Sequence, residues 1–352
     1  MTEVFASGSG VSRMMLNARS RVEVIVAPKA EMVNEPAVDV AAGSQLKRAL
    51  DALFKGGGKP ADENVACFVL AARAHRQGRA KQFDLFARGF NDAARRGMGA
   101  AICAELERRL SKALDDKEVP DFAEDVASLL KKQSQQSALN SGDSRVSDGA
   151  NPFQNIIDEL NDAMKSEDGN LDTYQKVVAY MTKVMQILSN FMSQIPNWVK
   201  SSDDGKKIEV WFGTMADALW SALPGKWVCN VPENEISEWK KELAPFIPSI
   251  IKFADDDGYP NWIEINYGSD GLLKQMDDSI RNSLSQDDGY LNPAAYQAWW
   301  AGFQGMESQV ENMVQTAAEK YSHRNSNFDN LIKIISSTVQ SMIDTSKQFL
   351  QL

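Results

Sequence analysis

Apolar residues recur at alternating steps of three and four along residues 293–352, the last 60 of the chain. This is the spacing of a narrow seam through which one helix packs against another. Asn292 can cap the first free amides of such a helix, and Pro293 suits its first position, where its missing N–H has no partner to lose. The first half of the seam comprises Tyr296, Trp299, Phe303, Met306, Val310, Met313 and Ala317.

Polar residues 322–327 interrupt this seam before it resumes. Tyr321, Arg324 and Asn325 lie at the break, and Tyr321 and Asn325 bridge its two halves with steps of four, a stutter that locally unwinds a supercoil. We expect the helix to bend here during assembly, and a tolerated stutter is the alternative. The second half of the seam comprises Phe328, Ile332, Ile335, Val339, Met342, Ser346 and Phe349.

The pattern predicts one uninterrupted helix over residues 293–352, because no proline follows Pro293 and the stretch holds only two glycines. At about 1.5 Å per residue this helix is on the order of 90 Å long, too long for the core of one compact domain. We therefore expect a stalk.

A second seam, of four heptads, offers the stalk helix a partner. The residues between the two seams can return the chain, so an antiparallel intramolecular coiled coil is predicted. An ordinary helical-bundle core is the alternative, and it predicts wider apolar faces. The second seam comprises Leu171, Tyr174, Val178, Met181, Met185, Leu188, Met192 and Ile195.

The other segments complete a fold that is mainly α with a small α/β insertion. Short amphipathic helices joined by glycine-containing turns predict an N-terminal helical hairpin or bundle. Residues 166–170 should interrupt the helix that carries the second seam. Alternating apolar residues at 208–212, 227–231 and 263–267, with short helices at 214–223, 233–243 and 272–284, predict a mixed α/β module. The predicted domains are a mobile leader (1–43), the N-terminal helical domain (44–138), a linker (139–150), the first coiled-coil helix region (151–199), the module (200–290) and the second coiled-coil helix (291–352).

Charge and chemistry exclude several classes of function. Residues 1–150 carry 22 Lys and Arg against 20 Asp and Glu, whereas residues 151–352 carry 16 against 28, so phosphates would be repelled and nucleic acid is not an expected partner. No apolar run is long enough to span a membrane, and no cleavable secretory signal is apparent. Three widely spaced cysteines are expected to be buried hydrophobes, and the isolated His75 and His323 predict no metal site. No catalytic constellation, metal or cofactor is predicted, so we do not expect an enzyme.

Several short sequences resemble the needle-tip proteins of type III secretion systems, the invasion-type hydrophilic translocators of the IpaD/SipD/BipD family. The resemblance covers about residues 151–352 and is weak before them. It rests on residues 236–243 (ISEWKKEL), 296–299 (YQAW), Phe303, 319–322 (EKYS), 325–326 (NS), 329–331 (DNL) and 346–351 (SKQFLQ).

The resemblance implies a protein exported by type III secretion through an uncleaved N-terminal signal and placed on the bacterial surface at the needle tip. It implies a small, usually pentameric ring that caps the needle, senses host signals such as bile salts, controls effector secretion and supports translocon assembly during cell invasion. The implied partners are the needle subunit, the hydrophobic translocator and further copies of the chain, and the host membrane is reached through them. It also implies that the N-terminal hairpin masks the stalk until assembly.

The terminal part of the C-terminal helix is the expected needle contact. The residues that match the family there are Lys347, Phe349, Leu350 and Gln351. The alternative is that Phe349 and Leu350 only complete the seam. At the level of the whole protein, the alternative function is a secreted coiled-coil effector that binds a host protein.

Overall fold

The computed structural model describes residues 37–54, 62–95, 99–115, 128, 130, 154–202, 206–254, 261–284 and 289–349. Contacts divide the chain into two compact units, Met1–Ala37 and Val38–Leu352. All described residues except Ala37 belong to the second unit. No helix among the described residues combines the length and apolar character that a membrane crossing needs.

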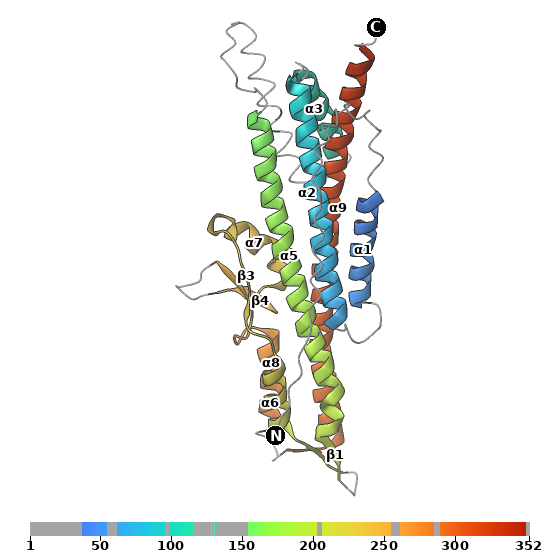
Figure 1. The fold of residues 1–352 in the computed structure, drawn as a ribbon. Coiled ribbons are helices and arrows are strands. Elements are labelled where there is room, and N and C mark those ends of the chain that lie inside the picture. Colours follow the sequence, from blue (N-terminus) through green and yellow to red (C-terminus); the bar gives the residue numbers. More distant parts are fainter. Residues whose placement is uncertain are drawn as a thin grey trace, which may run out of the picture. The chain divides into compact units, whose positions relative to one another are not determined.

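Two long helices run antiparallel along each other, α5 (Gln154–Gln194) and α9 (Pro293–Phe349) (Figure 1). The rings of Phe191, late in α5, and Phe303, early in α9, have centroids 5.8 Å apart. At the other end, Arg324 of α9 donates from Nε to Glu167 Oε1 of α5 over 2.8 Å. The predicted antiparallel pair and the fold class are therefore confirmed.

The start of α9 follows from the predicted cap. The side-chain Oδ1 of Asn292 accepts a hydrogen bond from the amide of Ala295 over 2.8 Å, and its backbone carbonyl accepts one from Tyr296 over 3.0 Å. From there α9 is helical as far as Phe349, straight through the polar residues 322–327. The break in the seam is thus not a break in the helix.

The predicted interruption of the other helix at residues 166–170 is wrong, because α5 is continuous there. Gly169 costs about 1 kcal/mol in a helix interior. Tertiary contacts offset this cost, since Glu167 pairs with Arg324 and Asp172 pairs with Arg76 Nη1 over 2.6 Å. The acidic residues and the glycine in this stretch suggested a turn. Partners that are distant in the sequence instead hold the stretch in the helix. The helix ends at Gln194 and passes into the 3-10 turn Ile195–Trp198.

The apolar face of α5 is wider than the predicted seam. Val177, Val184 and Phe191 are buried although they lie outside it. The reason is that α5 packs not only on α9 but also on α2, β3 and α6. The wider face is the one expected of the helical-bundle alternative, because other elements surround α5 on several sides.

The N-terminal helices are longer than the sequence predicts: α1 (Ala37–Phe54), α2 (Asp62–Arg95) and α3 (Gly99–Asp115). The first begins inside the predicted leader. The second runs through Gly78 and Gly89, where glycine-containing turns were expected, because its buried phenylalanines pack on one continuous surface. Both α2 and α3 contact α9, and α2 also contacts α5. Of the two cysteines whose side chains are described, Cys67 of α2 is exposed and Cys229 is buried, so the expectation of buried cysteines is wrong for Cys67.

The mixed module contains two small antiparallel sheets, with strand orders β1-β2-β6 and β3-β5-β4. Its three predicted helices are confirmed, α8 with the predicted bounds and the other two with shifted bounds, whereas β1, β4 and β6 were not predicted. The strands are β1 (Val199–Ser201), β2 (Ile208–Val210), β3 (Trp227–Asn230), β4 (Ile251–Phe253), β5 (Trp262–Ile265) and β6 (Tyr290–Leu291), and the helices are α6 (Phe212–Ala222), α7 (Ile236–Glu242) and α8 (Leu272–Leu284). Short 3-10 turns at Glu233–Glu235 and Ala244–Phe246 flank α7. The domain bounds themselves stay predictions.

Gly89 marks a close approach of α2 to α9. A Cβ at this position would lie 3.5 Å from Val339 Cγ1 and 3.8 Å from Ile343 Cδ1, which is ordinary van der Waals contact. Alanine therefore fits, and it has the higher helix propensity. We expect Gly89→Ala to raise the free energy of unfolding in urea by about 0.5–1 kcal/mol.

A larger side chain at the same place would overpack the interface. Gly89→Leu is expected to destabilise by about 1–3 kcal/mol. Gly302→Leu is the matched control, because a Cβ there meets nothing within 4 Å. Equal effects of leucine at both positions would show that α2 does not approach α9 closely at Gly89.

Glu307 of α9 carries an expected pH dependence of stability. Ser189 Oγ of α5 donates to Glu307 Oε1 over 3.4 Å. Burial raises the pKa of Glu307, and the hydrogen bond from Ser189 offsets only part of this. When the folded-state pKa lies above the unfolded value, the folded protein binds more protons between the two, so stability is lost as pH rises through that window.

We therefore expect Glu307→Gln to stabilise the protein at pH 7 by up to about 1 kcal/mol, and this gain to vanish below the unfolded pKa of about 4.3. Urea denaturation at pH 7 and pH 3.5 measures it, with the exposed Glu319→Gln as control. A gain of the same size at both pH values would contradict the assignment to burial.

Candidate functional site

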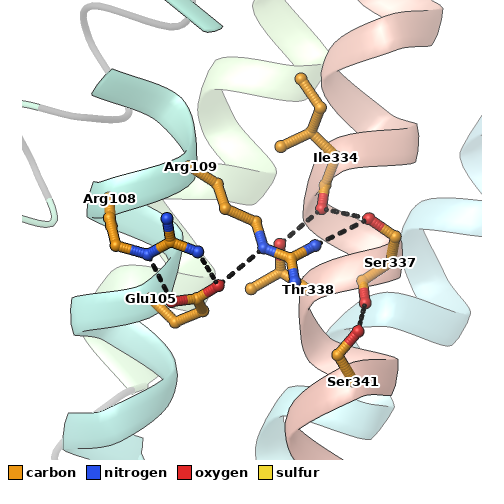
Figure 2. A network of polar contacts seen from close by, with 7 residues as sticks. All are labelled: Glu105, Arg108, Arg109, Ile334, Ser337, Thr338 and Ser341. Atoms are coloured by element: carbon orange, nitrogen blue, oxygen red, sulfur yellow. Dashed lines mark hydrogen bonds and ion pairs between the residues drawn. The ribbon is translucent and has the colours of Figure 1, made fainter. Parts of the chain in front are cut away.

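The C-terminal half of α9 is covered by the N-terminal helices. Val339 and Ile335 of α9 are buried, as are Phe86 and Phe90 of α2, and α3 packs against the same part of α9. Figure 2 shows the polar side of the α3 contact, in which Arg109 Nη1 donates to Ser337 Oγ over 3.4 Å. A helix that is predicted to contact other components is thus packed against helices of its own chain.

Glu105 organises the α3 side of this contact. Its carboxylate accepts hydrogen bonds from Arg108 and from Arg109 Nε, the latter over 2.8 Å (Figure 2). The hydrogen bonds from Arg108 and then Arg109 lower the pKa of Glu105 to about 2. Glu105 thereby orients Arg109, which reaches Ser337 of α9, whereas Arg108 is exposed.

The predicted needle contact falls at the edge of the described residues. Lys347 and Phe349 lie in the last turns of α9, and their side chains are outside the described residues. Leu350 and Gln351 are outside the described residues altogether. Their assignment to the needle contact stays a prediction.

Most seam positions lie in the core. On α5, Met192 alone of the predicted positions is only partly buried. On α9, Trp299, Met306, Met313 and Met342 are partly buried. Tyr296 is likewise partly buried. The buried positions are Leu171, Tyr174, Val178, Met181, Met185, Leu188 and Ile195 on α5, and Phe303, Val310, Ala317, Phe328, Ile332, Ile335 and Val339 on α9.

At the seam break, the polar residues of α9 meet α2. Tyr321 and Asn325 are buried, and the Tyr321 ring meets Phe68 of α2 edge-on with centroids 5.5 Å apart. Burial raises the pKa of Tyr321 to about 12. One turn further along α9, the carboxylate of Asp329 lies against two buried side chains of α2. His75 Nε2 lies 3.1 Å from Asp329 Oδ2, and Arg79 Nε lies 3.5 Å from Asp329 Oδ1.

Arg79 is a charged residue buried inside the protein, which costs desolvation free energy. Its side chain is 2 % exposed, and its guanidinium lies over the Phe328 ring, 4.6 Å from the centroid. Burial lowers the pKa of Arg79, and the charge of Asp329 opposes this shift. The charge of Asp168 acts in the same direction as that of Asp329. Because Asp329 is the first carboxylate to compensate this buried charge, its loss would leave the guanidinium poorly compensated.

Arg324 joins α9 to the opposite side. It binds Glu167 of α5 with two nitrogens, at 2.8 and 3.2 Å, and lies 3.9 Å from Glu242 of α7. Burial is the largest single effect on the pKa of Arg324 and lowers it. The hydrogen bonds to Glu167 and the charges of Glu167 and Glu242 together outweigh burial, so the pKa of Arg324 is raised. Tyr174 of α5 donates from its hydroxyl to Glu242 Oε1 over 3.0 Å, and burial raises its pKa.

The sequence predicted Tyr321, Arg324 and Asn325 as a polar break but missed the residues that meet it. The missing partners are Phe68, Glu167, Glu242 and Asp329. His75 and Arg79 in turn contact Asp329, and Arg76 joins α2 to Asp168 and Asp172 of α5. Two signals were available: the basic residues of α2 follow each other at helical spacing over 75–79, and Asp168 and Asp172 lie one turn apart. The bending expected at this break stays a prediction. Among the described residues, no group of three or more His, Cys, Asp or Glu could hold a metal ion.

Comparisons with known proteins place this arrangement in a family. A family model described as type III secretion systems tip complex components matches residues 79–350. The translocator protein BipD of Burkholderia thailandensis is 30% identical over 198 residues, which are 56% of this chain and 59% of BipD. BipD of Burkholderia pseudomallei strain K96243 matches over the same shares. The chain thus spans about 59% of the length of the curated relatives that it matches.

Solved structures share the fold. BipD of Burkholderia pseudomallei aligns with a TM-score of 0.50 at 22% identity, over 86% of this chain and 93% of BipD. A pathogenicity island 1 effector protein from Chromobacterium violaceum aligns with a TM-score of 0.52 at 22% identity, over 87% of this chain and 92% of that protein. At 22% sequence identity, these similarities show that the chain shares the fold of these structures.

Proposed function

The chain belongs to the family of type III secretion system tip complex components, and from this premise we propose that it caps the secretion needle. In this role it senses host signals, controls effector secretion and supports assembly of the translocon during invasion of host cells. Its partners are the needle subunit, the hydrophobic translocator and further copies of itself in a ring of about five. It is exported by the secretion system and acts at the needle tip.

One observation carries the proposal: the family match extends from residue 79 to residue 350. It includes α2 from Arg79 onward, both long helices and the last turns of α9. Lys347, Phe349 and Leu350 lie within it, and Gln351 follows directly. These four residues are the proposed needle contact.

The N-terminal helices are the proposed mask of this surface. They cover the C-terminal half of α9 through buried phenylalanines and a few polar contacts. Any component that takes the same face of α9 must first displace α2 and α3. The ionic contacts of α2 favour such a step, because the surfaces that separate would be partly polar.

A small-molecule signal belongs to the same proposal. The ligand class is an amphipathic carboxylate of the bile-salt type, and its support is the family resemblance alone. Isothermal titration of the purified chain with a bile salt below its micelle concentration tests it. Saturable binding at one or two sites supports sensing, whereas heat changes that appear only at micelle formation speak against it.

The proposal is tested in the bacterium that carries the secretion system. The chain is replaced by a variant that ends at Thr345. Loss of secretion control and loss of the protein from needle tips are the expected results, and the variant should keep its helical circular dichroism. Intact secretion control with an effector-like delivery of the chain into host cells would favour a secreted effector instead.

A further inference from the structure

One stretch of α9, residues 320–329, binds the mixed module on one side and the N-terminal helix α2 on the other. On the module side, Lys320 Nζ donates to the backbone carbonyl of Glu242 over 3.1 Å, and Arg324 lies 3.9 Å from the Glu242 carboxylate. Lys320 also lies over the Phe246 ring, 5.9 Å from its centroid. The end of α7 is therefore fastened to two successive turns of α9.

On the other side, the neighbouring positions of the same turns bind α2. Tyr321 meets Phe68, and Asp329 meets His75 and Arg79. Asn325 Nδ2 donates to Asp329 Oδ2 over 3.4 Å, which links the turn of Arg324 to the turn of Asp329. Contacts to α7 and to α2 thus alternate along one helical segment.

The same alternation occurs on α5. Glu167 is buried and pairs with Arg324, whereas the next residue, Asp168, lies 3.9 Å from Arg76 Nε of α2. One turn later, Asp172 binds Arg76. Two residues further on, Tyr174 donates to Glu242, and its ring lies tilted against Trp239 with centroids 5.5 Å apart. Both long helices therefore contact α7 and α2 in the segments where they lie side by side, joined by the Glu167–Arg324 pair.

We propose that residues 320–329 of α9 and 167–174 of α5 form a junction that couples the docking of α7 to the docking of α2. Loosening α7 of the mixed module then releases α2 from α5 and α9. Two discrete states are involved, with α2 docked or undocked. Glu242 acts as a positioning residue. Its carboxylate accepts a hydrogen bond from Tyr174 and lies 3.9 Å from Arg324. Tyr174 and Arg324 stand beside Asp172 and Asp329, which reach α2. A partner or ligand that moves α7 would then weaken the mask on α9 without touching α2. The coupling is a property of this fold and goes beyond the proposed needle function.

Hydrogen exchange of the full-length chain, followed by mass spectrometry, measures the opening of α2. The variant is Glu242→Ala. The matched control is Glu238→Ala, which removes the same side chain from an exposed position one turn earlier in α7. Coupling between sites typically changes an equilibrium about 5- to 150-fold. We expect Glu242→Ala to speed exchange in α2 at least about fivefold, and Glu238→Ala less than about twofold.

A double-mutant cycle with Asp329→Asn separates coupling from general destabilisation. In the Asp329→Asn background, Glu242→Ala should speed α2 exchange by a clearly smaller factor, because the linked contact is already weakened. Asp329→Asn alone should in turn speed exchange in α7, since coupling is reciprocal. Equal effects of Glu242→Ala and Glu238→Ala on hydrogen exchange in α2 would overturn the proposal. So would acceleration factors that simply multiply in the double variant. Equal acceleration of exchange in α2 and in the remote helix α8 would overturn it as well.

Discussion

Replacing Phe303 by alanine is expected to lower the free energy of unfolding by about 3–5 kcal/mol, as large-to-small changes at buried aromatic residues do. Phe303 is fully buried between the two long helices. Its ring contacts Phe191 at 5.8 Å and Trp299 at 5.5 Å between centroids. The substitution therefore removes apolar contacts to both helices and leaves a cavity at the end of the pair where α9 begins.

Chemical denaturation in urea measures this loss. Met306→Ala, one turn later and only partly buried, is the comparison and should cost clearly less. If Phe303→Ala lowered the free energy of unfolding no more than Met306→Ala does, the packing of the two helices around Phe303 would be contradicted.

Replacing Asp329 by alanine is expected to have the second large effect, about 3–5 kcal/mol, because it leaves a buried cation without its carboxylate. Arg79 is 2 % exposed and Asp329 25 % exposed, and His75 shares the same carboxylate. The control is Glu319→Ala, which removes an exposed acid earlier in α9 and should change stability by less than about 0.5 kcal/mol.

The origin of this loss can be checked by removing the stranded charge as well. The double variant Asp329→Leu with Arg79→Met replaces the pair by apolar groups of similar size. Such replacements are often neutral or stabilising. We expect the double variant to recover most of the stability that Asp329→Ala loses. A double variant as unstable as Asp329→Ala would show that Asp329 acts through other contacts.

The sequence was sufficient to predict the long C-terminal helix, because its signals are local. Asn292 and Pro293 mark the start, and the 3-4 spacing from Trp299 to Val339 continues without a proline. The family resemblance also rested on local stretches of this helix, and the family match bears it out.

The errors have a common physical cause, since each concerns a residue whose partner is distant in the sequence. Gly169 and its acidic neighbours suggested a turn, but Glu167 is held in α5 by Arg324, 157 residues away. Strand β4 was missed because its three residues are a strand only through pairing with β5. The width of the α5 apolar face could not be seen from α5 alone, because the module and α2 cover it.

The candidate site shows the same limit. The polar residues 322–327 are visible in the sequence as a defect in a seam. In the structure they lie at a junction of α9 with two elements that are distant in the sequence. His75 and Arg79 belong to α2, and Glu242 belongs to α7. Only the fold shows that the defect in the pattern is a surface for other helices.

Binding to filaments of the needle subunit tests the central claim most directly. Purified full-length chain and a form ending at Thr345 are co-sedimented with the filaments, and both are checked for folding by circular dichroism. The expected result is that the full-length chain binds and the shortened form does not. If neither binds while both are folded, the needle-cap function is contradicted. Equal binding by both would keep that function but contradict the placing of the needle contact at Lys347, Phe349, Leu350 and Gln351.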